Sequence, residues 1–295
     1  RKIQMVDREI AHVVVAHQQR EGAGFLVRRP VPTAGLDQVD PFLMLDEVGP
    51  VEYAPAQAIG APDHPHRGFE TVSYILAGEK LHEDSTGKSQ LLRAGDVQWM
   101  TAGAGIVHSE LPGPAFKASG GLAHGFQIWV NLPAASKFAT PGYQYLPAAE
   151  IPTARSPDGR IDVTVIAGKA FGVTAAIGTH TPIWLQEWRV RPGAAARIDI
   201  DPDFNVAAYV FEGAVAFGPD ARRVGRGEMA VFGPGAGIEV AAAADEALGR
   251  FLLLAGTPID EPVARYGPFV MNTPEQVMAA VQDYQSGRMG VIERA

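Results

Sequence analysis

The 295-residue chain contains no cysteine. A disulfide framework, a thiolate zinc site, an iron–sulfur cluster and a cysteine nucleophile are therefore excluded. A chain of this length buries about three quarters of its unfolded surface, so it needs no disulfide to fold. The absence of cysteine is consistent with a reducing compartment. Together with a composition rich in alanine, glycine and arginine, it leads us to expect a bacterial, cytoplasmic protein.

The chain also lacks long apolar runs. None approaches the roughly 18 residues that a membrane-spanning helix requires, and the run Phe251–Ala255 reads as a buried strand. The N-terminus opens with alternating charges rather than a basic segment followed by an apolar one, which does not resemble a signal peptide. We therefore expect no association with a membrane.

Positive charge is scarce. The formal net charge is −8 and the pI is near 5.5, so a surface that binds nucleic-acid phosphates is not expected. The basic pairs Arg28-Arg29 and Arg222-Arg223 are short and are typical of solvated surface. Direct binding of nucleic acid is therefore not expected, and any regulatory role would act through proteins.

Glycine and proline are frequent, with 33 and 23 residues, and they divide the chain into short segments. Many of these segments alternate in polarity or are rich in β-branched and aromatic residues. Short strands at near-regular spacing favour an all-β barrel or sandwich. The expected strands are Glu70–Leu76, Val97–Thr101, Gly125–Val130, Ile161–Ile166, Ile183–Val190, Val206–Phe211 and Phe251–Leu254.

One helix is expected near the C-terminus. Thr273 is a candidate N-cap, Pro274 occupies the first helical position, and Gln276 completes a capping-box pattern. The apolar residues at helical spacing predict one buried face. That face contains Val277, Met278, Val281 and Tyr284.

An internal repeat indicates two copies of one barrel. The segment His64–Gly78 resembles Asp199–Gly213, and the motif Gly103–Ile106 recurs as Gly235–Ile238. With a boundary placed near residues 143–152, we expect three consecutive parts. These are an N-terminal metal-binding barrel (1–145), a C-terminal barrel without metal ligands (146–270), and a helix with a tail (271–295).

Four side chains at matched spacing predict a metal site. His64 and His66 form one i, i+2 pair, and His108 and Glu110 form another. Because residues i and i+2 share one face of a strand, two antiparallel strands would bring all four to one point. Three imidazoles and a carboxylate suit iron, manganese, nickel, copper or zinc and leave coordination positions open. Open positions indicate chemistry rather than structural cross-linking.

The second half of the chain lacks such a set. The repeat aligns His64 and His66 with Asp199 and Asp201, and it aligns His108 and Glu110 with Val240 and Ala242. The second barrel is therefore expected to have lost the site. Among the other histidines, His12, His17 and His82 are interpreted as surface or hairpin residues and His180 is given no role, while His124 is either structural or a neighbour of the ligands.

Several longer motifs resemble the pirin family, a branch of the cupin superfamily. The resemblance is dense over residues 40–133 and sparser beyond them. In ordinary cupins the carboxylate ligand would be at Glu70, whereas in pirin-like proteins the position of Glu110 takes that role, which leaves Glu70 structural or adjacent to the ligands. The motifs are Asp40–Glu47, Asp63–Val72, Gly95–Gly103, Gly105–Glu110, Trp129–Pro133, Glu261–Val263 and Tyr266–Asn272.

The resemblance implies two tandem antiparallel cupin barrels with iron, as Fe(II), in the N-terminal one. It also implies dioxygenase activity on flavonols such as quercetin, and a regulatory role in some members. Our first hypothesis is therefore a metal-dependent dioxygenase acting on a small aromatic substrate. Glu110 is the catalytic candidate that takes the hydroxyl proton, and Trp99 and Met100 either line the pocket or belong to the core.

A second hypothesis is a redox- or metal-responsive regulator that binds a protein partner, with catalysis incidental. A cupin isomerase or sugar-binding barrel is the least favoured interpretation. Whether the protein is an enzyme at all stays open at the level of the sequence.

Overall fold

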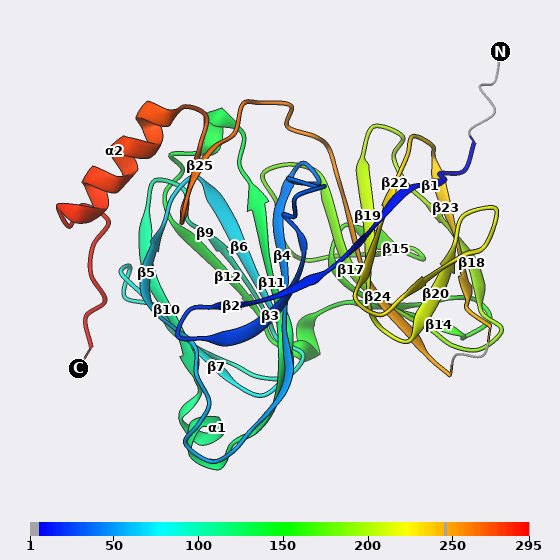
Figure 1. Ribbon diagram of the computed structural model, residues 1–295, viewed down its shortest axis with the longest axis horizontal. Coiled ribbons are helices and arrows are strands. Elements are labelled where there is room, and N and C mark those ends of the chain that lie inside the picture. Colours follow the sequence, from blue (N-terminus) through cyan, green and yellow to red (C-terminus); the bar gives the residue numbers. More distant parts are fainter. Residues whose placement is uncertain (1–5, 245–246, 295) are drawn as a thin grey trace. The chain divides into compact units, whose positions relative to one another are not determined.

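The computed structural model describes residues 6–244 and 247–294 (Figure 1). The chain forms two compact units, each described here by itself. One contains residues 6–17, 30–41 and 151–258 except 245–246, and the other contains residues 18–29, 42–150 and 259–294. Among the described residues, no helix is long and apolar enough to cross a bilayer.

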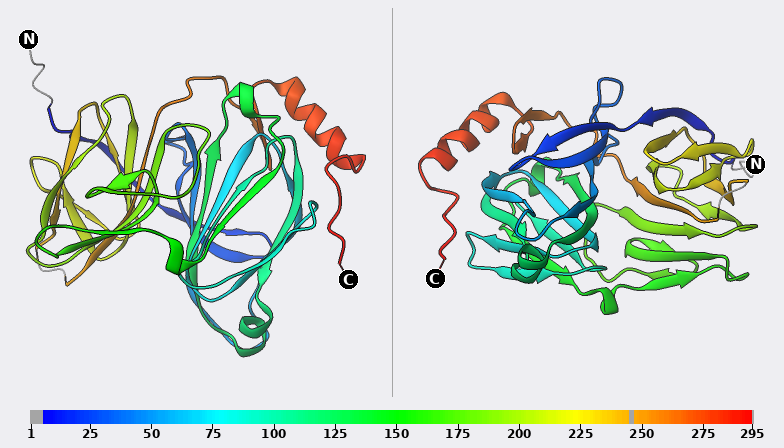
Figure 2. Two further views of the ribbon diagram at one scale, coloured as in Figure 1. Left: turned by 180° about the vertical axis from the view of Figure 1, so that it is seen from behind. Right: turned by 60° about the horizontal axis from the view of Figure 1, so that its bottom comes forward.

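The unit that carries the four predicted ligands is a barrel of two antiparallel sheets (Figure 2). The larger sheet has the order β12-β9-β6-β11-β4-β3-β2, and the smaller has the order β5-β10-β7-β8. Its strands are β2 (His17–Glu21), β3 (Phe25–Val31), β4 (Phe42–Tyr53), β5 (Ala61–His66), β6 (Phe69–Ala77), β7 (Lys80–Asp84), β8 (Ser89–Leu92), β9 (Val97–Thr101), β10 (Ile106–Pro112), β11 (Gly121–Asn131) and β12 (Gly142–Leu146).

Three shorter elements complete this unit. The helix α1 (Pro114–Ser119) connects β10 to β11, and the hairpin of β25 (Ala264–Tyr266) and β26 (Phe269–Met271) belongs to the C-terminal segment. A Cβ atom on Gly68 would lie 2.0 Å from the carbonyl oxygen of Val270, so this close approach of the hairpin requires glycine. The C-terminal segment is therefore packed directly against the strand connection that follows β5.

The other unit repeats the same architecture. Its larger sheet has the order β1-β22-β19-β24-β17-β14-β13, its smaller sheet has the order β18-β23-β20-β21, and β15 pairs with β16. Its strands are β1 (Ile10–Val15), β13 (Thr153–Arg155), β14 (Ile161–Ala167), β15 (Lys169–Ala170), β16 (Val173–Thr174), β17 (Ile183–Val190), β18 (Ala195–Asp199), β19 (Asn205–Glu212), β20 (Ala214–Phe217), β21 (Arg222–Gly225), β22 (Glu228–Phe232), β23 (Gly237–Ala242) and β24 (Gly249–Gly256).

The expected fold class, two antiparallel β-barrels in tandem with a C-terminal helix, is confirmed. All seven expected strands lie within observed strands, because alternation and β-branching suit a pleated, half-buried surface. The units are not consecutive in sequence, whereas we expected the parts 1–145, 146–270 and 271–295. The difference arises because β1 completes the sheet of β22, and residues 259–294 belong to the ligand-bearing unit.

Strand register refines the internal repeat. In the ligand-bearing unit His66 lies opposite Ile106 and His64 opposite His108, while in the other unit Ile198 lies opposite Ile238 and Ala196 opposite Val240. The structural counterparts of His64 and His66 are therefore Ala196 and Ile198 rather than Asp199 and Asp201. The connection from β18 to β19 is longer than that from β5 to β6, and this displaced the sequence alignment.

The C-terminal helix α2 (Pro274–Gln285) begins as expected. The Thr273 side chain accepts a hydrogen bond from the backbone N–H of Gln276, and the Gln276 side chain accepts one from the backbone N–H of Thr273. Its buried face was predicted only in part. Val277 and Ala280 are buried against the hairpin, whereas Met278 is 55% exposed and Tyr284 39% exposed.

Candidate metal centre

Strand pairing brings the three histidines together. His64 and His66 lie on β5, which pairs antiparallel with β10, and His108 on β10 lies directly opposite His64. The ring centroids are 4.3 Å apart for His64 and His108, 4.8 Å for His64 and His66, and 4.9 Å for His66 and His108. Their candidate ligand atoms all lie within 4.8 Å of one another. Among the described residues, this is the one group of three or more such side chains with that geometry.

The hydrogen bonds of the histidines select the ring nitrogen that each leaves for a metal. The Nδ1 atom of His64 lies 2.7 Å from the carbonyl oxygen of Pro62, and that of His66 lies 3.4 Å from the carbonyl oxygen of Pro268. A carbonyl oxygen only accepts, so both Nδ1 atoms carry the proton and both Nε2 atoms keep a lone pair. Metal-binding histidines typically donate their other ring N–H to an oxygen acceptor in this way.

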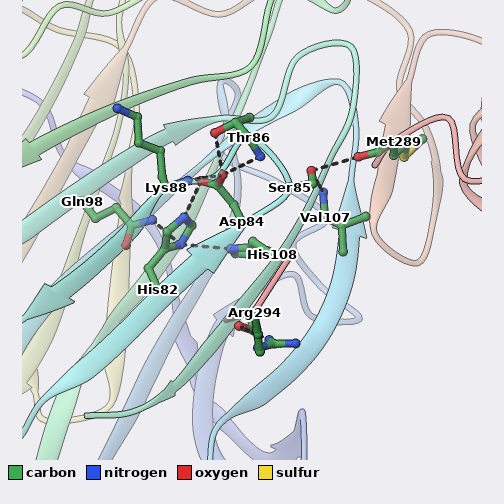
Figure 3. Close-up of polar contacts among 11 residues, drawn as sticks. His82, Asp84, Ser85, Thr86, Lys88, Gln98, Val107, His108, Met289 and Arg294 are labelled. Atoms are coloured by element: carbon green, nitrogen blue, oxygen red, sulfur yellow. Dashed lines mark hydrogen bonds and ion pairs between the residues drawn. The ribbon is translucent and has the colours of Figure 1, made fainter. Parts of the chain in front are cut away.

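His108 is oriented by a buried network behind it (Figure 3). The Nε2 atom of His82 lies 2.7 Å from Oδ2 of Asp84, so it donates to that carboxylate. The Nδ1 atom of His82 then accepts, from Nε2 of Gln98 at 2.8 Å and from Nδ1 of His108 at 3.5 Å. Asp84 is itself held by Thr86, whose backbone N–H and hydroxyl both donate to its Oδ1 atom.

This network leaves Nε2 of His108 as the lone-pair nitrogen. Within the part of the chain that the structure describes, that atom is buried and has no hydrogen-bond partner. A buried polar atom without a partner costs about 1–3 kcal/mol. A metal ion bound to the three Nε2 atoms would supply the missing interaction, so the residues present fit such an ion.

The protonation states also suit metal binding. Burial lowers the pKa of His66 to about 3 and holds the pKa of His108 well below its usual value. Both imidazoles are therefore neutral at pH 7, which is the form that binds a metal. Imidazole nitrogens suit zinc, copper, iron and nickel, so the three histidines could hold a transition metal and do not select one among these.

Glu110 lies in the same site but outside this group of three. The strand register shifts between His108 and Glu110, which lie opposite His64 and Ala61, and such a bulge redirects a side chain. The Oε1 atom of Glu110 accepts hydrogen bonds from the Ser73 hydroxyl at 2.9 Å and from Lys80 Nζ at 3.0 Å. Ligation by Glu110 therefore stays a prediction.

Lys80 controls the charge of Glu110. Burial alone would raise the pKa of this carboxyl, but the positive charge of Lys80, followed by the influence of His108 and His64, holds it well below its usual value. Glu110 is therefore ionised throughout the neutral range. The side chains of the pair are only 22% and 10% exposed, so solvent screens their attraction weakly.

The C-terminal tail covers the strands that carry the ligands. Arg294 makes two hydrogen bonds to the carboxylate of Asp63, at 2.6 and 3.0 Å, and further ones to Glu83 and to the hydroxyl of Ser109. Ser109 follows the ligand position His108 directly. Ser85 joins the tail to the same strands, because its hydroxyl bonds both the carbonyl oxygen of Met289 and the N–H of Val107 (Figure 3).

A pocket of about 520 Å³ opens onto His64 and His66. Its size lies within the range of small-molecule sites. Trp129 packs edge-on against His66, with ring centroids 5.4 Å apart, and the guanidinium of Arg265 lies 4.9 Å from the Trp129 ring centroid. We define the metal pocket by its lining residues Glu21, Gly22, Phe25, Arg29, Met44, Asp46, Ala61, Pro62, Asp63, His64, His66, Glu110, Gln127, Trp129, Arg265, Gly267 and Pro268.

The structure places three further residues that the sequence analysis named. His82 lies on the expected hairpin, since β7 pairs with β8, but it is also fully buried beneath His108, which was not expected. The motif His82-Glu83-Asp84, again with i, i+2 spacing, was the signal that could have revealed it. Trp99 and Met100 are fully buried core residues and do not line the metal pocket.

The two remaining candidates make structural contacts. Glu70 accepts a hydrogen bond from the Thr101 hydroxyl at 2.7 Å, which places it away from the ligand role it holds in ordinary cupins. His124 pairs with Glu47 at 2.9 Å rather than with a ligand. Both outcomes agree with the structural alternative stated for each residue.

The fold and the site together define a protein of two tandem cupin barrels, one of which contains a group of three histidines that could hold a metal ion. Family models agree: the Pirin model matches residues 24–130, and the Pirin C-terminal cupin domain matches residues 185–290. The chain is 43% identical to a pirin-like protein of Solanum lycopersicum, over 96% of this chain and 93% of that one. It is 40% identical to the pirin of Homo sapiens, over 98% of this chain and 96% of that one. The chain belongs to the pirin family.

A solved structure shows the same likeness over nearly the whole chain. A quercetin 2,3-dioxygenase from Acinetobacter baumannii is similar with a TM-score of 0.91 and 34% identity, covering 98% of this chain and 100% of the other.

Proposed function

We propose that the protein is a metal-dependent dioxygenase that acts on flavonol-like substrates of the quercetin type, with Fe(II) as the native metal. The observation that carries this proposal is the group of three histidines whose candidate ligand atoms lie within 4.8 Å of one another, two of which, His64 and His66, line a pocket of about 520 Å³. The likeness to a quercetin 2,3-dioxygenase supports the choice of substrate. Manganese, nickel, copper and zinc are the alternatives for the metal.

His64, His66 and His108 would hold the metal, with Glu110 as the proposed fourth ligand. An iron ion there would supply Lewis acidity and a redox couple suited to reaction with dioxygen. The network of His82 and Asp84 keeps His108 in the tautomer that offers Nε2. The half-buried aromatic ring of Trp129 in the wall of the metal pocket favours a flat substrate.

Glu110 is the proposed acceptor of the substrate's hydroxyl proton. It is ionised at neutral pH, so its carboxylate is able to accept a proton. Its low pKa makes it a weak base, so it takes a proton only from a hydroxyl that coordination has acidified. Lys80 stays within hydrogen-bond distance of the same carboxylate and balances its charge before the transfer.

The test uses protein purified without added metal. Its metal content is measured first, and oxygen uptake with quercetin is then followed under air and under nitrogen. We expect turnover in air, and we expect His108→Ala to lose both the bound metal and the oxygen uptake while remaining folded. His180→Ala, at an exposed histidine in the other unit, is the matched control. Undiminished turnover by His108→Ala rejects the proposal.

The regulatory hypothesis makes a different prediction. A redox-responsive regulator should bind its protein partner with different affinity in the ferrous and ferric forms. Equal recovery of partner by both forms removes this alternative, and a difference in the absence of flavonol turnover favours it over catalysis.

A further inference from the structure

A second cavity lies in the same barrel and has no part in the mechanism described so far. Its volume is about 130 Å³. We call it the apolar chamber and define it by the apolar side chains that contribute most of its wall, which come from β4, β6, β10, α1 and β11. These are Val48, Ile75, Leu111, Phe116 and Phe126.

The apolar chamber adjoins the metal pocket. Phe25, Asp46, Ala61, Glu110 and Gln127 line both cavities. The hydroxyl of Ser73 lies between two of these shared residues, at 2.9 Å from Glu110 Oε1 and 3.0 Å from Gln127 Oε1. One narrow polar belt therefore separates a metal-binding compartment from an apolar one.

Two charged pairs border the apolar chamber. Lys80 is bonded to Glu110 at 3.0 Å, and His124 is bonded to Glu47 at 2.9 Å. Asp46 and Glu79 also line the chamber, so its walls disfavour an anionic ligand, which would leave water without a counter-ion. They suit an uncharged ring that buries apolar surface.

The volume sets the size of the occupant. An apolar protein cavity of about 150 Å³ holds one benzene molecule. At about 130 Å³, the apolar chamber has room for a single six-membered aromatic ring. Phe116 and Phe126 supply aromatic surface for edge-to-face or offset contacts with such a ring.

We propose that the apolar chamber binds one uncharged aromatic ring, the pendant ring of a substrate whose metal-binding part occupies the metal pocket. The part of this proposal that assigns the ring to a flavonol-like substrate rests on the proposed function. It makes the enzyme selective for 3-hydroxychromones that carry a pendant phenyl or hydroxyphenyl ring, as flavonols do, over those that lack it. The belt residue Gln127 lies where the two parts of the substrate join.

The test compares two ligands that differ only in that ring, 3-hydroxyflavone and 3-hydroxychromone. Dissociation constants are measured under nitrogen, where no turnover occurs, by titration calorimetry on the protein as purified. We expect the wild type to bind 3-hydroxyflavone at least tenfold more tightly than 3-hydroxychromone. Phenol serves as a third probe, of the ring alone, and should bind the wild type measurably.

The variant that fills the apolar chamber is Ala77→Leu. Ala77 lines the chamber and lies two and four residues after Ile75 and Ser73, so all three share one face of β6. We expect this variant to lose phenol binding and to bind the two larger ligands within twofold of each other, with the affinity for 3-hydroxychromone unchanged. Ala77→Ser, of nearly unchanged size, is the matched control, and Ala123→Leu fills the same chamber from β11 if the first variant does not fold.

The outcomes separate the two proposals. The chamber proposal is overturned if the wild type binds both ligands equally, or if a tenfold preference for 3-hydroxyflavone persists in a filled variant. Turnover of either ligand in air upholds the proposed function. If neither ligand is turned over, the proposed function fails, and phenol then decides the chamber. Failure of the wild type to bind phenol, or phenol binding unchanged in a filled variant, overturns it.

Discussion

Replacing Lys80 by methionine isolates the electrostatics of the centre. The ammonium of Lys80 lies 3.0 Å from Glu110 Oε1, and their side chains are 22% and 10% exposed. At an effective dielectric constant of about 20, two unit charges at this distance attract by about 5 kcal/mol before desolvation is counted. Removing one partner of a buried pair costs about 3–5 kcal/mol, and we expect about 3 here because the pair is partly exposed.

The loss should depend on pH in a defined direction. In the wild type the pKa of Glu110 lies below its ordinary value of 4.5, so its stabilising contribution is complete above that value and is lost as the pH falls through the lowered pKa. Without Lys80, the pKa of this carboxyl rises from its wild-type value, because burial raises it and only the weaker influences of His108 and His64 still lower it. The variant's penalty is then complete at pH 7 and shrinks as the carboxyl takes up a proton on acidification.

The assay is urea unfolding of metal-free protein at pH 7 and near pH 4. Lys80→Met should be less stable by about 3 kcal/mol at pH 7, with a smaller deficit near pH 4, and the double variant Lys80→Met/Glu110→Gln should recover part of the loss. Lys88→Met, at an exposed lysine of the following hairpin, is the control. A loss below about 1 kcal/mol, as exposed ion pairs give, or one that is equal at both pH values, would refute the reasoning.

Three further outcomes are expected from the ligand-bearing barrel. His82→Phe removes the acceptor for Nδ1 of His108. Metal binding, measured by competition with a chelator, should therefore weaken about 10- to 100-fold. Unchanged affinity would show that the network does not orient His108. Lys137→Met leaves three acceptors, among them the carbonyl oxygens of Gly68 and Val270, without their buried donor. The free energy of unfolding should therefore fall by about 3 kcal/mol. A urea midpoint within error of the wild type would contradict this expectation. Gly68→Ala places a Cβ 2.0 Å from the carbonyl oxygen of Val270 at a φ of +89°, so thermal denaturation should occur several degrees lower, and an unchanged midpoint would contradict the close approach.

Local patterns in the sequence determined much of this protein. Alternation and β-branching identified all seven expected strands, and the capping box at Thr273 identified the start of α2, because both signals depend on neighbours along the chain. The i, i+2 spacing of His64 and His66 placed them together on one strand. The pairing of that strand with the one that carries His108 was predicted from the matching spacing of His108 and Glu110, and the register confirms it.

Tertiary structure alone decided what surrounds the ligands. The bulge that turns Glu110 towards Lys80, and the burial of His82 beneath His108, depend on contacts between strands that no local pattern encodes. The same holds for the tail residue Arg294, which reaches Asp63 across 231 positions of sequence. Periodicity specifies which face of a strand a side chain occupies. The side chain or backbone group that it contacts is set only when the barrel closes, because the buried polar atoms must then form hydrogen bonds with one another.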